Sequence, residues 1–204
     1  MDKRRRGRPS RSGGGRARDE ILRVAREVFA EMGYERATFT EIAERAGYTR
    51  PAINHHFPDK ASLYHASLES VRDTVINGGV EHAVAHETLP GRLSGFLEGA
   101  VQVDSQDRSF ARFIAASVLD GFRHPQLQEH TRGQVDQVRT FVRQALGAAV
   151  DNGEVRADLD VPAVTEMLIA VMWGMGLYAG FMGTHEQLEK VVEQFSRLVA
   201  GILW

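Results

Sequence analysis

The chain has 204 residues, 43% of them hydrophobic, and a formal net charge of −2. This composition is typical of one large or two small domains with a buried core, and it argues against a collagen-like or wholly disordered chain. Cysteine is absent, which excludes disulfides, thiolate metal sites and cysteine nucleophiles.

The charges are distributed unevenly along the chain. Residues 1–60 carry 14 Lys and Arg against 9 Asp and Glu, a balance of +5, and the remaining residues carry 11 against 18, a balance of −7. A basic front on an acidic body indicates that a polyanion binds at one end of the molecule. The basic amino terminus lacks the apolar core of a signal peptide, so we expect a cytoplasmic protein.

Residues 1–18 are predicted to form a disordered basic arm. They hold eight basic residues, three consecutive glycines and too few apolar side chains to offset the entropy of ordering the chain. The run RGRP resembles the core of an AT-hook, whose arginines, here Arg6 and Arg8, insert into the narrow minor groove of A/T-rich DNA. The alternative is a basic tail that raises non-specific affinity by counterion release.

The rest of the chain is predicted to be all-α, because apolar residues recur at helical spacing throughout. A first helix ends at Gly33. A second helix begins at a predicted capping box, in which the Thr38 hydroxyl and the Glu41 carboxylate satisfy free amides, and it ends at Gly47.

A third helix is predicted to begin at Thr49, with Pro51 in its first turn, where a missing amide hydrogen is harmless. Two short helices joined by a glycine-containing turn form a helix-turn-helix, so residues 19–65 are predicted to be a three-helix domain of that type. A longer helix, beginning at Asp59 and weakened at Gly78 and Gly79, links this domain to a helical bundle. The bundle occupies residues 66–204, with helices expected near 91–104, 107–119, 125–151, 160–182 and 185–203.

Three short motifs carry a family resemblance: TFTEIA at 38–43, AGYT at 46–49 and HHFPDK at 55–60. Together with the surrounding residues, from 21 to 68, they resemble the amino-terminal DNA-binding domain of the tetracycline-repressor (TetR) family. The resemblance implies a homodimeric transcription regulator whose body binds a small molecule. The chain departs from the family pattern at Asn54, where the family most often has tyrosine, and at Pro51, where it has a small residue.

The residues themselves support the same function. A helix that exposes Thr49, Arg50 and Asn54 in its first turns presents donors and a cation to a DNA groove. Threonines at a helix start and a nearby lysine are suited to phosphates, although capping and surface charge also explain them. The predicted DNA-binding residues are Arg6, Arg8, Thr38, Thr40, Thr49, Arg50, Pro51, Ala52, Asn54, His55, His56 and Lys60.

The last two helices are predicted to form the dimer interface, because the final helix repeats apolar residues at spacings of three and four. The family resemblance implies that these helices form a four-helix bundle between two subunits. The predicted interface residues are Leu188, Val191, Val192, Phe195, Leu198, Val199 and Ile202. The uncharged stretch 167–185, about 28 Å long as a helix, is a marginal membrane span by length. Without a second hydrophobic segment we expect a buried helix and no membrane.

The body carries more aromatic bulk than a small bundle needs, which indicates an apolar ligand pocket, with core packing as the alternative. The predicted pocket residues are Phe96, Phe110, Phe113, Ile114, Phe122, Met172, Trp173 and Tyr178.

These patterns predict a ligand-responsive repressor that binds a palindromic operator in double-stranded DNA as a homodimer and is released by a small apolar or aromatic effector. One alternative is an activator of the same family. Another is a small helical metal enzyme using His82 and His86, whose spacing suits metal ligands but also ordinary helix surface. The run GMGLYA at 174–179 spells a dinucleotide fingerprint, but no strand precedes it. We expect no catalytic residue, metal or cofactor.

Overall fold

A computed structural model describes residues 11–202. Every regular element in this range is helical, which confirms the predicted all-α class. Two elements, η1 and η2, are single turns of π-helix that continue α4 and α9 without a break. In chain order the elements are α1 (Arg11–Arg36), α2 (Phe39–Ala46), α3 (Arg50–His56), α4 (Lys60–Val71), η1 (Arg72–Ile76), α5 (Asn77–Val84), α6 (Leu89–Gln106), α7 (Ser109–Arg123), α8 (Pro125–Asp151), α9 (Val161–Leu177), η2 (Tyr178–Met182) and α10 (His185–Val199).

Side-chain caps fix where α2, α3 and α4 begin. Thr38, Thr49 and Asp59 each accept a hydrogen bond from the backbone amide three residues further on, at 3.2, 3.3 and 2.7 Å. The capping box predicted at Thr38 forms only in half. The Glu41 carboxylate pairs with Arg45 at 2.6 Å instead of turning back to the cap, so the prediction was wrong for Glu41.

Helix α1 begins earlier than predicted. We expected disorder as far as residue 18, whereas the structure has helix from Arg11 onward. The Arg18 guanidinium lies 5.4 Å from the centre of the Phe57 ring, which ties this part of α1 to the end of α3. Extending an existing helix also costs much less than starting one. At the other end, Gly33 breaks the helix with a φ of 74°, a conformation that glycine adopts without strain.

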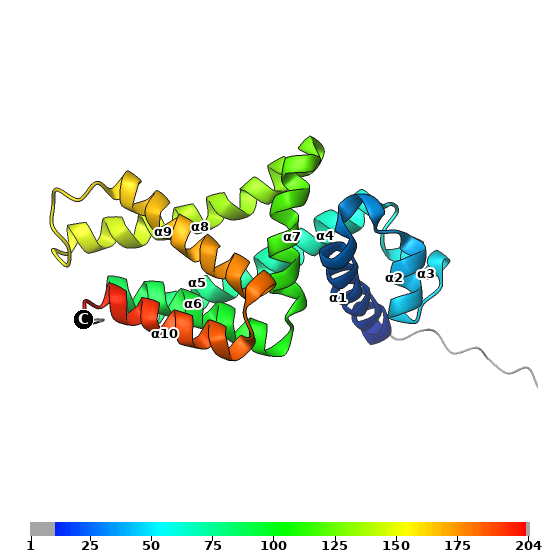
Figure 1. Ribbon diagram of the computed structural model, residues 1–204, viewed down its shortest axis with the longest axis horizontal. Helices are drawn as coiled ribbons and strands as arrows, with labels where there is room; N and C mark the ends of the chain where they lie inside the picture. Colours follow the sequence, from blue (N-terminus) through cyan, green and yellow to red (C-terminus); the bar gives the residue numbers. More distant parts are fainter. Residues whose placement is uncertain (1–10, 203–204) are drawn as a thin grey trace, which may run out of the picture.

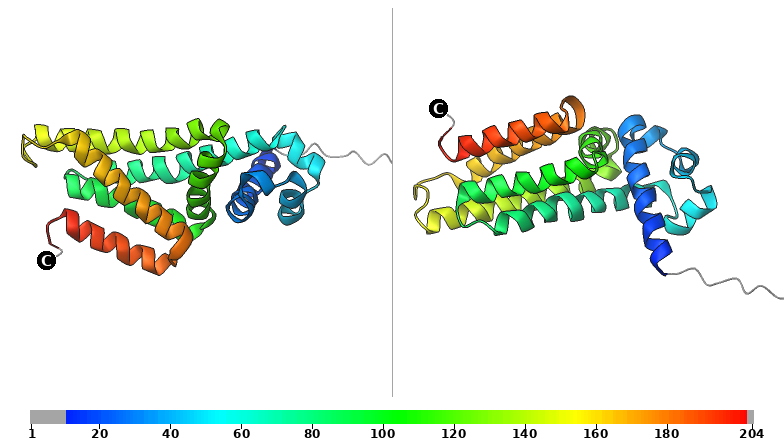
Figure 2. Two further views of the ribbon diagram at one scale, coloured as in Figure 1. Left: turned by 45° about the horizontal axis from the view of Figure 1, so that its top comes forward. Right: turned by 90° about the horizontal axis from the view of Figure 1, so that it is seen from below.

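The molecule has a head, which we define as α1 to α3, and a body, α5 to α10 (Figure 1). Helices α4 and α5, with η1 between them, form one continuous rod from the head into the body (Figure 2). The expected weakness at Gly78 and Gly79 does not end the rod, which runs to Val84. A Cβ at Gly79 would lie 2.9 Å from the Phe96 carbonyl oxygen, so glycine is what lets α5 and α6 approach closely.

Two clusters of buried side chains hold the molecule together. The first contains Phe29 and Ile53 of the head and Tyr64 of α4, and it continues into Phe113 of α7. The Phe113 ring lies 6.1 Å from that of Phe29 and 5.2 Å from that of Tyr64. The second cluster fills the body between α6, α8, α9 and α10. Because the first cluster extends from the head into the body, a shift of α4 or α7 alters the position of the head.

Candidate functional site

Helix α3 buries one side and exposes the other. Ile53, together with Phe57 just after the helix, lies in the core of the head. The opposite side exposes a guanidinium, an amide and an imidazole, groups that hydrogen-bond to base edges and phosphates. The structure thus brings the predicted recognition residues together: Thr49, Arg50, Pro51, Asn54 and His55 are exposed, and Ala52 and His56 are half-buried.

The threonines predicted to bind phosphates lie at the starts of α2 and α3. Thr38, Thr40 and Thr49 are all exposed. The hydroxyls of Thr38 and Thr49 already accept capping hydrogen bonds, and each still has a proton to donate. Arg6 and Arg8 of the predicted minor-groove arm lie outside the described residues.

The Lys60 side chain is used within the head. Its Nζ donates a hydrogen bond to the Glu35 carbonyl oxygen at 2.9 Å and lies 4.6 Å from the centre of the Tyr34 ring. The ammonium therefore satisfies a free carbonyl at the end of α1, where a cation is favoured. Two of its three donors remain, so the phosphate contact of Lys60 stays a prediction.

A buried arginine joins the head to the body. Arg26 of α1 donates to Asp107 at 2.7 Å, to Ser109 at 2.8 Å and to Ser70 of α4 at 3.1 Å. Its guanidinium also lies 3.8 Å from the centre of the Phe110 ring. Burial lowers the pKa of Arg26 against the opposing effect of Asp107. Although burial alone would raise the pKa of Asp107, its hydrogen bonds with Ser109 and the charge of Arg26 hold that pKa below its usual value.

A buried carboxylate makes a second junction. Asp120 of α7 accepts hydrogen bonds from the Tyr34 amide at 3.1 Å and from the Tyr64 hydroxyl at 3.2 Å. Burial, with the nearby negative charge of Asp120, raises the pKa of Tyr64 far above its usual value. Asp120 thus binds the end of α1 and the middle of α4 to the same body helix, so the head is held at two places by buried polar groups.

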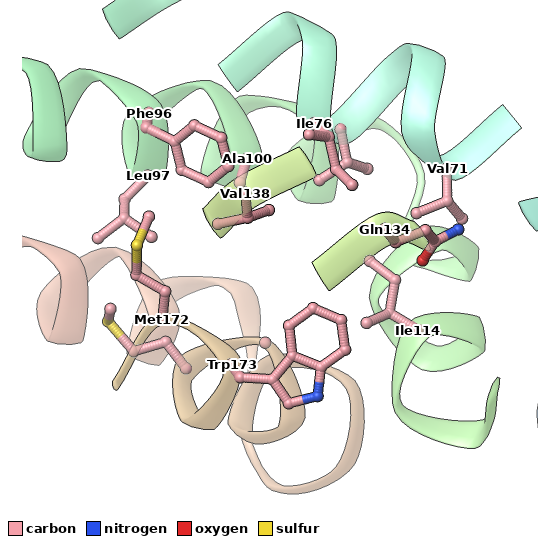
Figure 3. A pocket seen from close by; sticks show the side chains of 13 residues that line it. Val71, Ile76, Phe96, Leu97, Ala100, Ile114, Gln134, Val138, Met172 and Trp173 are labelled. Carbon is pink, nitrogen blue, oxygen red and sulfur yellow. The ribbon is translucent and has the colours of Figure 1, made fainter. Parts of the chain in front are cut away.

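A small apolar cavity in the body lies against the connecting rod (Figure 3). Its volume is about 100 Å³, and its lining contains no charged side chain. Val71, Val75 and Ile76, from the end of α4 and from η1, form one wall. Gln134 and Trp173 are the residues of the lining whose side chains carry a hydrogen-bonding group. A ligand bound in this cavity would contact the rod that carries the head.

Comparison with known proteins assigns the chain to a family. Residues 21–67 match the family described as bacterial regulatory proteins of the tetR family, and residues 90–203 match the carboxy-terminal domain of BetI-type transcriptional repressors. The chain belongs to the TetR family. It is therefore a DNA-binding transcriptional regulator and not an enzyme.

Named relatives of this TetR-family regulator agree with that assignment. It is 30% identical over 158 residues to the transcriptional repressor AcnR of Corynebacterium glutamicum, with 78% of this chain and 79% of AcnR covered. It is 24% identical over 162 residues to the transcriptional regulator UidR of Escherichia coli K12, with the same two coverages. The crystal structure of FadR from Bacillus subtilis in complex with stearoyl-CoA has a TM-score of 0.74 at 17% identity, covering 91% of this chain and 99% of FadR. That likeness shows a shared fold.

The predicted pocket residues divide into two groups in this TetR-family structure. The cavity is lined by four of them, Phe96, Ile114, Met172 and Trp173. The other four do not line it: Phe110 and Phe113 are buried in the core that joins the head to α7, so their placement in a pocket was wrong, whereas Phe122 and Tyr178 line separate grooves. All eight lie on apolar helix faces, but these faces point in different directions.

Trp173 lines two adjacent spaces in the body. Its side chain borders both the cavity and a groove of about 200 Å³ between α7, α8 and α9. Phe122 lies in the wall of that groove.

The predicted dimer seam on α10 is largely covered within the chain. Leu188, Val192 and Phe195 are buried in the core of the body, so the prediction that they face a partner was wrong. The apolar stripe they form is covered by this chain's own α6. Of the other predicted residues, Leu198 and Ile202 are exposed, while Val191 and Val199 are half-buried.

The exposed apolar surface lies instead on α9 and η2. Among the described residues, one helical stretch, Val161–Met182, is long and apolar enough by length and composition to cross a membrane. Only 28% of its most apolar 18-residue window is buried, against our expectation of a buried helix. The exposed side includes Met167, Val171, Leu177 and Phe181, the last of which is 83% exposed.

The histidines weighed as metal ligands are exposed, His82 on α5 and His86 just beyond its end. His82 Nδ1 lies 3.0 Å from the Gly78 carbonyl oxygen, and the rings of His82 and His86 approach Gly99 and Gly95 of α6. Within residues 11–202 no group of three or more potential metal-ligating side chains occurs. Family membership, rather than this geometry, decides against the metal-enzyme alternative.

Proposed function

We propose that this protein is a cytoplasmic repressor that binds a palindromic operator as a homodimer and is released by a small apolar effector. The observation that carries the proposal is the division of α3, whose apolar side is buried in the head and whose polar side is free to enter a major groove. The name of the relative AcnR, a repressor, favours repression over activation.

The operator can be tested by selection of bound duplexes from a random library with the purified full chain. We expect enrichment of an inverted repeat, because a two-fold dimer places two α3 helices in major grooves about 34–36 Å apart, one helical turn of DNA. The selection is done at a fixed ionic strength, since non-specific affinity depends steeply on salt. If no sequence is enriched, or only single half-sites are, the proposed mode of binding is wrong.

The surface that best fits a second copy is the exposed side of α9 and η2. It carries large apolar side chains and, from Met167 to Met182, no charged residue. Exposed apolar surface of this extent marks an interaction site in a protein that works in water. The family resemblance of the last two helices supports self-association there, and Leu198 and Ile202 of the carboxy-terminal segment are also exposed.

A Val171→Arg variant is expected to be monomeric where the unaltered chain has about twice the mass of 22.7 kDa. Val171 is exposed on α9, so the arginine is tolerated in the monomer but would be an unpaired charge inside the interface, at a cost of several kcal/mol. The masses are measured by light scattering during size-exclusion chromatography. Val84→Arg, which makes the same change at an exposed valine of α5, is the control and should stay dimeric. A dimeric Val171→Arg protein would place the interface elsewhere.

The cavity beside α4 and η1 is the proposed effector site. A volume of about 100 Å³ is below that of most ligand sites, so an effector must push its walls apart, and one wall is the rod that carries the head. Without a cation in the lining, a coenzyme A group such as that bound by FadR has no charged partner here. A small uncharged effector fits better. A coupling of about 1–3 kcal/mol, usual for allosteric proteins, weakens operator binding about 5- to 150-fold.

A further inference from the structure

One polar side chain stands out in the apolar cavity. Gln134 of α8 lines it and is only 5% exposed. Its amide nitrogen Nε2 donates a hydrogen bond to the Leu68 carbonyl oxygen of α4 at 2.9 Å. Within residues 11–202 no group donates to the other amide atom, Oε1. Since the nitrogen is fixed on α4, the atom that Gln134 offers to the cavity is a hydrogen-bond acceptor.

The remaining lining offers little polar competition. Figure 3 shows the six-membered ring of Trp173 turned toward the centre of the cavity and its indole nitrogen turned away. Beyond these two residues the lining consists of aliphatic, aromatic and methionine side chains and glycine. Because Gln134 Oε1 accepts no hydrogen bond from the described residues and borders the cavity, a molecule that brings a donor to it gains a hydrogen bond in addition to apolar contact.

We propose that the effector is an uncharged apolar molecule with one hydrogen-bond donor, such as a hydroxyl group, and that Gln134 Oε1 accepts from it. This inference rests on the proposed effector site. The same amide holds α4 through Leu68, one turn before the π-helical segment at Arg72. Gln134 is therefore the side chain through which a bound donor acts directly on the rod.

Matched pairs of small probes that differ only in a hydroxyl or a methyl group test the proposal. Binding of para-cresol and para-xylene, and of phenol and toluene, is measured by calorimetry with the full chain and with Gln134→Met. Methionine keeps the length of the side chain and removes the acceptor. The Leu68 carbonyl still accepts from the Arg72 amide in the variant, so the fold is retained. We expect Gln134→Met to reduce the preference for the hydroxyl member of each pair about two- to tenfold.

The control variant is Gln144→Met, which makes the same change at an exposed position of α8 and should leave the preference unaltered. An unchanged preference in Gln134→Met, or failure of all four probes to bind the unaltered chain, overturns the inference. Operator binding is measured on the same samples. Intact operator binding with an unchanged preference rejects only the role of Gln134, whereas an unaltered chain that selects no operator rejects the proposed function itself.

Discussion

An Arg26→Ala variant is expected to unfold with a free energy about 3 kcal/mol lower than that of the unaltered chain. The Arg26 side chain is 5% exposed and pairs with Asp107. Removing it leaves a partly buried carboxylate without its cation, and it removes the donors to Ser70 and Ser109 and the contact with the Phe110 ring. Removing one partner of a buried ion pair is strongly destabilising, because it leaves the other charge buried and unpaired. Replacing both partners by apolar residues changes the stability much less. Urea denaturation followed by circular dichroism measures the change.

Arg23 on the same helix is the matched control. It also makes two ion pairs, with Glu20 and Glu27, but its side chain is 38% exposed. Solvent screens exposed pairs, so Arg23→Ala is expected to cost less than about 1 kcal/mol. Equal losses in the two variants would mean that burial at the junction of head and body adds nothing to the stability that Arg26 provides.

The head was predictable from the sequence because its signals are local. Thr38 and Thr49 cap helices by hydrogen bonds to amides three residues away, and Gly33 and Gly47 end helices by their own backbone angles. None of these depends on distant parts of the chain. The same locality explains why the exposed side of α3, with Arg50 among its residues, was placed correctly on the surface.

The failures concern choices between partners, which periodicity does not encode. The Glu41 carboxylate could accept a hydrogen bond from the backbone amide at the cap or pair with Arg45, and in the structure it pairs with Arg45. On α10, the regular apolar stripe predicted correctly that Phe195 is buried. Whether α6 or a second copy covers it depends on the tertiary structure, which the stripe does not encode. Phe113 was an apolar helical residue with the same ambiguity between a cavity and a core.

Gln134 was missed although the sequence held a signal for it. It stands four residues before Val138 and eight before Val142, both buried on the same side of α8. A polar residue in register with a buried face requires a partner inside the protein. Arg26 is a second case, since it lies among the buried residues of α1. Such residues identify the junctions and the cavity, but their partners are known only from the fold.

An Arg50→Ala variant is expected to bind the selected operator at least about thirty times more weakly than the unaltered chain. An arginine contact to a guanine edge contributes about 1–3 kcal/mol, and a dimer on a palindrome loses that contact twice, once in each half-site. The loss follows from the proposed position of Arg50, which is exposed in the first turn of α3, where helix-turn-helix proteins reach base edges. Fluorescence anisotropy with a labelled duplex, at one salt concentration, measures the affinity.

The control for that measurement separates recognition from general charge. Arg143→Ala removes the same charge from an exposed position of α8 in the body, and it should change operator affinity by less than about twofold. In a repeated selection with Arg50→Ala, the operator position that Arg50 contacts should no longer be enriched in one base. If Arg50 contacts a phosphate instead, the variant should bind all sequences more weakly to the same degree. If Arg50→Ala binds as tightly and as selectively as the unaltered chain, α3 does not enter the groove by its first turn.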